Sequence, residues 1–296
     1  MRRRTLLALM PAFAVGLHRA HAADAPLVVA SFSILADMAR VVVGDSAVVS
    51  TLVPVDGDAH VWEPRPDDLR RVQRARVLIE NGLGLEGWMR RLPEAAGFKG
   101  LLVTAARAVT PHKMIEDGHS IIDPHAWQNP QNGILYVRAI ADGLAQEFAD
   151  AAPAIRSRAD AYIAEIAETD RWIVQTLAPI PPAKRQILTS HDAFGYYGAR
   201  YGIRISGVQG ISTESEPSAH DIATLVAQIK RDNIRAVFVE NMTDPRLAAA
   251  VAREAGAVLG PTVYSDALSA KGGPADSYLR MLRHNTTAFA TAMAAN

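Results

Sequence analysis

The chain contains one unusually long helical pattern, which begins at Pro153 and continues to Leu177. After that first proline it has no glycine or proline, and it is rich in alanine, glutamate and arginine. About 25 residues at 1.5 Å each give a helix of roughly 37 Å, longer than the usual helix of a compact domain. A proline cluster at 179–182 ends the pattern. We interpret this helix as a connection between two lobes.

On both sides of this helix, short apolar, β-branched runs alternate with segments of helical periodicity. This rhythm predicts an α/β fold with parallel-type sheets flanked by helices. Strands are expected at 27–31, 48–53, 77–80, 101–103, 186–190, 204–208, 236–239 and 257–264. Helices are expected at 33–43, 66–74, 85–96, 130–149, 194–201, 219–232, 245–255 and 274–293. We therefore predict an N-terminal lobe at 23–150, a linker helix at 151–180 and a C-terminal lobe at 181–296.

The N-terminus has the pattern of a secretory signal peptide. Arg2, Arg3 and Arg4 precede a mostly apolar stretch at 5–16, and Ala20-His21-Ala22 offers a small-x-small cleavage site. We expect export through the Sec route, with the twin-arginine route as the alternative. The apolar stretch is too short to span a membrane, and no later stretch is longer, so the mature protein is not expected to be membrane-embedded.

The cysteine count and the charge balance exclude several classes of protein. The sequence has no cysteine, which excludes disulfides, thiolate metal ligands and a lipidated cysteine, so we expect a periplasmic protein. Its 31 Lys and Arg residues balance 31 Asp and Glu residues, so no basic surface points to nucleic acid as a partner. We expect a monomer.

Three histidines lie in short contexts that contain aspartate: Asp58-Ala59-His60, Asp123-Pro124-His125 and Ser190-His191-Asp192. Pro124 and Pro130 stiffen the loop that carries His125. Each histidine follows a predicted strand or a stiffened loop, and Asp266 follows the last strand in the same way. Open α/β sheets bind ligands at such strand ends. Two of these residues come from each half, so we predict one metal site in a cleft between facing walls, with His125 on the near wall and His191 and Asp266 on the far wall.

Three imidazoles and one carboxylate suit four-coordinate zinc, whereas manganese and iron accept this set but prefer more oxygen. Ligand imidazoles must be neutral, so affinity is expected to fall as the pH drops through about 6.5. Surface or capping histidines are the plain alternative. A secreted zinc hydrolase is another, although catalytic zinc usually keeps three protein ligands and one open position.

Four further residues are candidates for the surroundings of the metal. Glu240 and Asp192 are expected to accept hydrogen bonds that fix an imidazole tautomer, or to be ordinary loop carboxylates. Trp62 and Trp127 each follow a candidate histidine by two residues. We expect them to exclude water from the site or to pack in the core.

The segments 58–64, 123–130, 189–196 and 237–241 resemble motifs of the periplasmic zinc- and manganese-binding components of ABC transporters, the cluster A-I solute-binding family. The resemblance covers nearly the whole mature chain in order. It implies two α/β lobes joined by a long, rather rigid helix, with the metal between them and ligands at His60, His125, His191 and Asp266. It also implies a metal-capture function rather than an enzyme, a separate permease and, for some members, a metallochaperone partner. The chain has no GxxxxGK[ST] loop, so the ATPase must be a separate protein.

In that family, histidine at the third ligand position tends to accompany zinc, and glutamate there accompanies manganese or iron. His191 therefore predicts high-affinity capture of Zn(II), with Mn(II) or Fe(II) as the alternative. Zinc members often carry a long His-rich loop before the second ligand. Here the corresponding segment at 111–122 is short, is expected to be turn-rich, and offers only His112 and His119 as a metal-capture loop.

Overall fold

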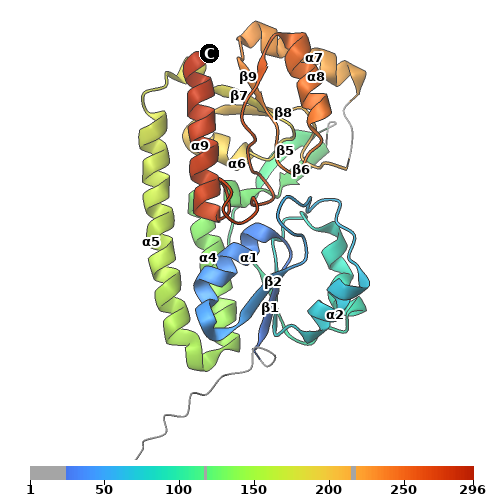
Figure 1. The fold of residues 1–296 in the computed structure, drawn as a ribbon, viewed down its shortest axis with the longest axis vertical. Coiled ribbons are helices and arrows are strands. Elements are labelled where there is room, and N and C mark those ends of the chain that lie inside the picture. The colour runs from blue at the N-terminus through green and yellow to red at the C-terminus, as the bar shows by residue number, and fades with distance from the viewer. Residues whose placement is uncertain (1–24, 117–118, 215–217) are drawn as a thin grey trace, which may run out of the picture.

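The computed structural model describes residues 25–116, 119–214 and 218–296 (Figure 1). The predicted signal peptide at 1–22 lies outside these residues. Among the helices of the described residues, none has the length and apolar character needed to cross a membrane.

The first half is built on a parallel sheet of four short strands with the order β2-β1-β3-β4. These strands are β1 (Leu27–Ala30), β2 (Val48–Thr51), β3 (Val77–Glu80) and β4 (Leu101–Thr104). The helices of this half are α1 (Ser33–Val43), α2 (Pro66–Arg74), α3 (Leu92–Ala95) and α4 (Pro130–Glu147). Central strands β1 and β3 consist mainly of buried apolar residues, as parallel strands covered on both faces require.

The second half repeats this plan with the strand order β10-β9-β7-β8, also parallel. Its strands are β7 (Gln186–Thr189), β8 (Arg204–Gly207), β9 (Ala236–Phe238) and β10 (Val258–Leu259). Its helices are α6 (Gly195–Tyr201), α7 (Ala219–Asp232), α8 (Pro245–Ala255) and α9 (Tyr278–Ala295).

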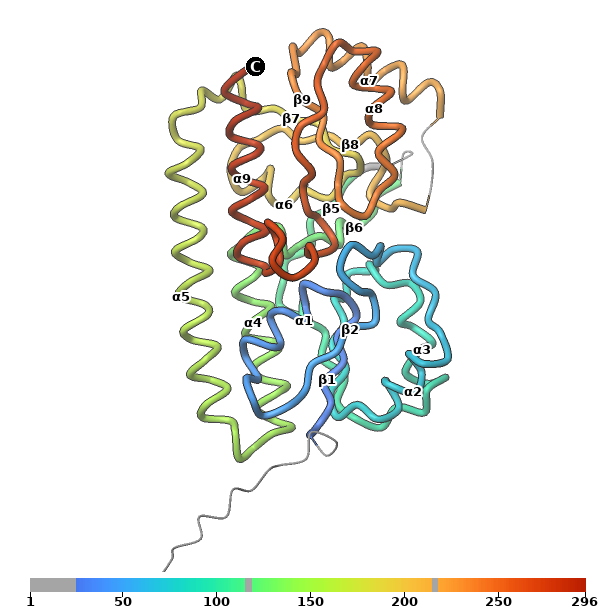
Figure 2. Tube along the Cα trace, viewed as in Figure 1, coloured from blue at the N-terminus to red at the C-terminus, as the bar shows by residue number. Residues whose placement is uncertain are grey.

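Between the halves runs α5 (Ala152–Leu177), a helix of 26 residues that packs along α4 and α9 (Figure 1). The predicted architecture of two α/β parts joined by one long helix is confirmed. The lobe boundaries at 23–150, 151–180 and 181–296 stay predictions, because α9 also contacts the first half. The start of α9 lies close to α1 (Figure 2). Tyr278 at this start donates its main-chain N–H to Asp37 and its hydroxyl to the carbonyl of Trp127.

The hydrophobic core consists of one cluster that both halves share and two smaller clusters, each within one half. Its largest cluster contains side chains of both halves, among them Phe32, Trp127, Phe194 and Phe289. One smaller cluster belongs only to residues 29–96, and another only to residues 188–252. The halves are therefore joined on one side by continuous apolar packing.

Two predicted elements in the first half are wrong. The expected helix at 85–96 is a 3₁₀ turn (Gly87–Arg90) followed by the four-residue α3, because Pro93 lacks an N–H to continue the turn into a helix. The segment at 111–122, expected to be turn-rich, is an antiparallel pair of strands, β5 (His112–Glu116) and β6 (His119–Asp123).

Two elements near the C-terminus also differ. The strand expected at 257–264 is only β10 and one isolated bridge between Val263 and Glu240. Gly260 still donates its N–H to the carbonyl of Val237, but Pro261 has no N–H with which to continue the ladder. The last helix begins at Tyr278 instead of 274, where the Ser277 side chain accepts the N–H of Arg280 and caps the helix.

Candidate metal centre

The two histidines of the first half are mounted by the same local device. Asp58 Oδ1 accepts the main-chain N–H of His60 at 2.9 Å, and Asp123 Oδ1 accepts that of His125 at 2.9 Å. Aspartate commonly bonds the backbone two residues further on and so stabilises a turn. The Asp-x-His spacing thus holds each histidine in a defined turn.

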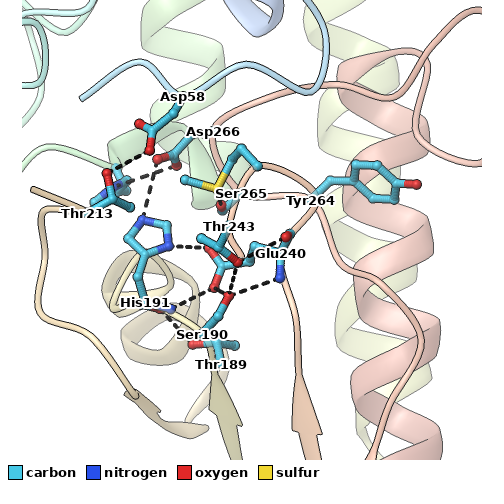
Figure 3. A network of polar contacts seen from close by, with 12 residues as sticks. Asp58, Thr189, Ser190, His191, Thr213, Glu240, Thr243, Tyr264, Ser265 and Asp266 are labelled. Carbon is cyan, nitrogen blue, oxygen red and sulfur yellow. Dashed lines mark hydrogen bonds and ion pairs between the residues drawn. The ribbon is translucent and has the colours of Figure 1, made fainter. Parts of the chain in front are cut away.

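His191 is mounted from the second sheet. It lies just beyond β7, and its N–H donates to Glu240 Oε1 at 2.9 Å (Figure 3). The Ser190 hydroxyl donates to the same oxygen at 2.9 Å. Glu240 follows β9, the neighbour of β7 in the sheet, so adjacent strand ends bring the two residues together.

Asp266 comes from the segment that leads from the second sheet towards α9. The carbonyl of Ser265 accepts bonds from the side chains of Trp127 and Gln128, and the N–H of Leu268 donates to the Ser33 hydroxyl. The expectation that Asp266 belongs to the far wall with His191 stays a prediction, because this segment is bonded to both halves. Val263 pairs with Glu240 of the second half, whereas Ser265 and Leu268 are bonded to the first.

The four side chains singled out from the sequence converge on one point. His60 Nε2 lies 3.2 Å from His125 Nε2 and 3.2 Å from Asp266 Oδ2, and His191 Nε2 lies 3.4 Å from that oxygen. One potential ligand atom from each residue falls within 4.8 Å of all the others. All four residues are buried, and His60 is the most exposed at 7%.

Several buried polar atoms at this point lack hydrogen-bond partners among the described residues. His191 Nε2 and both Asp266 oxygens are buried without a hydrogen bond to any described residue. Buried polar atoms without partners are costly and rare, so their convergence indicates that a further group belongs between them. Nitrogen and oxygen lone pairs that point inward suit a cation.

The charges of the site favour positive charge at its centre. Burial alone would lower the pKa of His125, but the Asp266 and Asp123 carboxylates raise it to about 9. Burial is likewise outweighed at His191, where Glu240 and Asp266 hold the pKa well above its ordinary value. Burial would raise the pKa of Asp266, yet His125 and His191 hold it well below its usual range. Without a cation, protons on the imidazoles supply the charge that these carboxylates require.

Two carboxylates orient the imidazole rings. His125 Nδ1 lies 2.8 Å from Asp123 Oδ1, and His191 Nδ1 contacts Glu240 Oε2. A carboxylate accepts the Nδ1 proton, so Nε2 keeps its lone pair for a metal. The role expected of Glu240 thus fits the geometry. Asp192 does not fit it, because its side chain has no hydrogen bond to either ring within the described chain, and Asp123 takes that place at His125.

The whole chain can now be compared with known proteins. The family model described as "Zinc-uptake complex component A periplasmic" matches residues 28–292. The chain belongs to this family.

Relatives of this zinc-uptake component A family carry several metals in their names. The manganese-binding lipoprotein MntA of Halalkalibacterium halodurans is 31% identical over 266 residues, covering 90% of this chain and 88% of that protein. The iron ABC transporter substrate-binding lipoprotein MtsA of Streptococcus pyogenes serotype M1 is 30% identical over 270 residues, covering 87% and 86%. The structure of the periplasmic zinc-binding protein TroA from Treponema pallidum aligns with a TM-score of 0.86 at 25% identity, covering 91% of this chain and 99% of that one.

The remaining predicted residues of this family member lie at different distances from the centre. The buried Trp127 ring packs edge-on against His125, with 5.4 Å between ring centres. The Trp62 ring lies under the guanidinium of Arg65. His112 Nδ1 is 3.8 Å from Asp123 Oδ2, so it reaches the far side of the carboxylate that holds His125. His119 is exposed, and its backbone lies opposite Glu116 in the antiparallel register of β5 and β6.

Proposed function

We propose that the protein captures a divalent transition-metal cation outside the cytoplasm and delivers it to the permease of an ABC importer, and that this cation is Zn(II). The observation that carries the proposal is the convergence of His60, His125, His191 and Asp266, whose potential ligand atoms lie buried within 4.8 Å of one another. Family membership supports the transport role.

The donor set supports zinc as the cargo. Three imidazole nitrogens and one carboxylate match the ligands and the coordination number that zinc prefers in proteins. Manganese prefers oxygen-rich surroundings, and sites of mixed nitrogen and oxygen donors bind it more weakly than zinc. His191 is the residue that makes the set rich in nitrogen.

Manganese or iron is the second candidate. It is favoured by the names of relatives, since MntA is named for manganese and MtsA for iron. A carboxylate such as Asp266 can offer both oxygens, which would add the oxygen ligand that these metals prefer.

The site supports binding rather than hydrolysis. A hydrolytic zinc centre needs an open coordination position for water, and four protein ligands would occupy a tetrahedral zinc completely. The burial of all four side chains also leaves little access for a substrate.

Several further parts of the function are proposed with it. We expect export by residues 1–22, residence in the periplasm as a monomer, and partnership with a separate permease and ATPase. A metallochaperone that loads the site, and metal capture by His112 and His119, are proposed as additions. The lobes would divide at 150 and 180.

Calorimetry on the purified mature chain tests the site. We expect about one Zn²⁺ per chain and a loss of affinity of at least about 100-fold in His125→Ala, above the range typical of residues behind a ligand. His220→Ala is the matched control, because that histidine is exposed in the first turn of α7. Absence of zinc binding by the wild-type chain, or equal zinc affinities of the two variants, would contradict the proposal.

Metal identity needs a separate experiment. We expect protein offered equimolar Zn²⁺ and Mn²⁺ to retain zinc, as measured by elemental analysis. Most nitrogen-containing sites would do so. The deciding measurement is therefore the metal content of protein isolated from its native periplasm, where retained manganese or iron would establish the second candidate.

A further inference from the structure

The surroundings of the metal centre differ between the side that faces α5 and the side that faces a surface cavity. Towards α5, the halves share the largest apolar cluster of the molecule. On another side, they border a polar cavity of about 500 Å³. It is lined by residues of both halves: Asp58, Gln209, Thr213, Met242, Thr243, Asp244, Arg246 and Leu247. Since all four candidate ligands are buried, a bound cation can leave only when part of this surrounding structure opens.

At the edge of this cavity, polar contacts join the two halves. Local opening starts where apolar contacts are few and polar contacts are partly exposed. At this edge, residues 56 and 58 of the first half are hydrogen-bonded to Asn241 and Thr213 of the second, and Thr213 is only half-buried. Separating the halves on the α5 side would instead expose the shared apolar core, which costs about 25 cal/mol per Å².

Asp58 connects this edge directly to a candidate ligand. Its Oδ1 accepts the main-chain N–H of His60, and its Oδ2 accepts the hydroxyl of Thr213 at 2.7 Å (Figure 3). One carboxylate thus fixes the turn that carries His60 and also ties that turn to the second half. The bond from Asn241 to Asp56 lies close by in the same loop, but Asp56 is exposed, so that bond is expected to contribute less.

We propose that Thr213 is a positioning residue that sets the rate at which the bound cation leaves through this cavity. It acts through Asp58: while the hydroxyl is bonded, the turn with His60 stays against the second half and the centre stays closed. When the bond breaks, the turn is free to move and His60 withdraws from the cation. This inference rests on the proposed function, because it concerns the release of the same cargo.

Thr213→Val tests the role, since valine keeps the shape and removes the hydroxyl. We expect transfer of Zn²⁺ from the loaded protein to an excess of chelator to become about tenfold faster, equivalent to about 1.4 kcal/mol. The rate of zinc uptake should change less than about twofold, because most affinity differences between related complexes lie in dissociation. Thr213→Ser, which restores the hydroxyl, should return release to near the wild-type rate.

Thr176→Val is the matched control, because the Thr176 hydroxyl bonds the carbonyl of Trp172 in its own helix, α5, and no other group of the described residues. Should Thr213→Val fail to fold, Thr213→Ala with Thr213→Ser gives the same comparison. Release of Zn²⁺ from Thr213→Val at the wild-type rate would overturn the inference. Release from Thr213→Ser as fast as from Thr213→Val would overturn it as well. A wild-type protein that takes up no zinc would instead overturn the proposed function itself.

Discussion

Asp123 contacts both the main-chain N–H and the imidazole ring of the candidate ligand His125. Its Oδ1 accepts the main-chain N–H of His125 and lies within hydrogen-bonding distance of that residue's ring nitrogen. Backbone and ring are therefore both oriented by one buried carboxylate two residues away. Asp58 resembles it at the backbone of His60, but its second oxygen goes to Thr213.

Asp123→Asn is expected to weaken zinc binding about 10- to 100-fold, the range for residues that orient a ligand. The amide keeps the size of the side chain but removes the charge that makes the ring a better donor. Asp192→Asn is the control, because Asp192 lies next to a candidate ligand in sequence and its side chain bonds no histidine ring of the described residues. Competition with a chromophoric chelator measures both. Equal losses in the two variants would contradict the assigned role.

Zinc affinity should keep rising with pH up to about 9. The folded, metal-free site raises the pKa of His125 to about 9, so this imidazole carries a proton at neutral pH, and it also raises the pKa of His191. A cation must displace these protons, and its apparent affinity therefore falls as the pH drops below those pKa values. The window lies above the pH of about 6.5 expected from free imidazole.

Calorimetry at pH 7.4 in buffers of different ionisation enthalpy measures this competition. We expect at least about one proton to be released per zinc, because the His125 imidazole starts protonated and the raised pKa of His191 favours a second proton. Release of no protons at this pH, with affinity constant from pH 7 to 9, would show that the imidazoles are already neutral in the free site.

The sequence allowed the four converging residues to be named, but not all of their surroundings. His60, His125 and His191 stood out because aspartates and prolines mark their loops. Asp123 was overlooked as a ring partner because it was treated only as part of the loop. Its second role depends on how the turn folds back on itself, which spacing alone does not reveal.

At the level of elements, the local pattern predicted the long helices and most of the short parallel strands, and it failed at 85–96, 111–122 and 257–264. The boundaries of α5 follow from a helical pattern that nothing interrupts. The hairpin of β5 and β6 lacks a clear period, because its strands pair mainly with each other and bury little. The pairing of β10 is short because Pro261 has no N–H to donate to the ladder, a limit that the surrounding apolar run conceals.

Asp170 makes α5 a support for both halves. Its carboxylate accepts a bond from Gln131 at the start of α4, and further bonds from Arg200 and Tyr201 at the end of α6. Helix α4 follows the loop of His125, and α6 follows the segment of His191. One side chain of the long helix thus fixes the two helices nearest to these candidate ligands.

Asp170→Asn is expected to lower the free energy of unfolding by about 1–3 kcal/mol, because the buried Tyr201 hydroxyl and the charged Arg200 guanidinium lose their carboxylate acceptor. Urea denaturation monitored by circular dichroism measures the change. Asp160→Asn, at an exposed position of the same helix, is the control and should be nearly neutral. Equal stability of the two variants would show that the bonds to α4 and α6 contribute nothing.

At the scale of the whole molecule, the alternating rhythm was sufficient to predict two α/β halves and a long helix. It was insufficient to predict that the segment of Asp266 is bonded to both halves. Its contact with the first half depends on bonds from Trp127 and Gln128 to Ser265, across more than a hundred residues of sequence. Such long-range pairing leaves no periodic trace in the sequence.

The shared apolar cluster has a consequence for how such a chain can change during evolution. Side chains of both halves, such as Phe32 and Phe289, fill one continuous interior. A recombination event that replaced only the second half would bring in side chains shaped for another partner, and close-packed interiors tolerate such mismatches poorly. New cargo preferences are therefore expected to arise by substitution around the cleft rather than by exchange of halves.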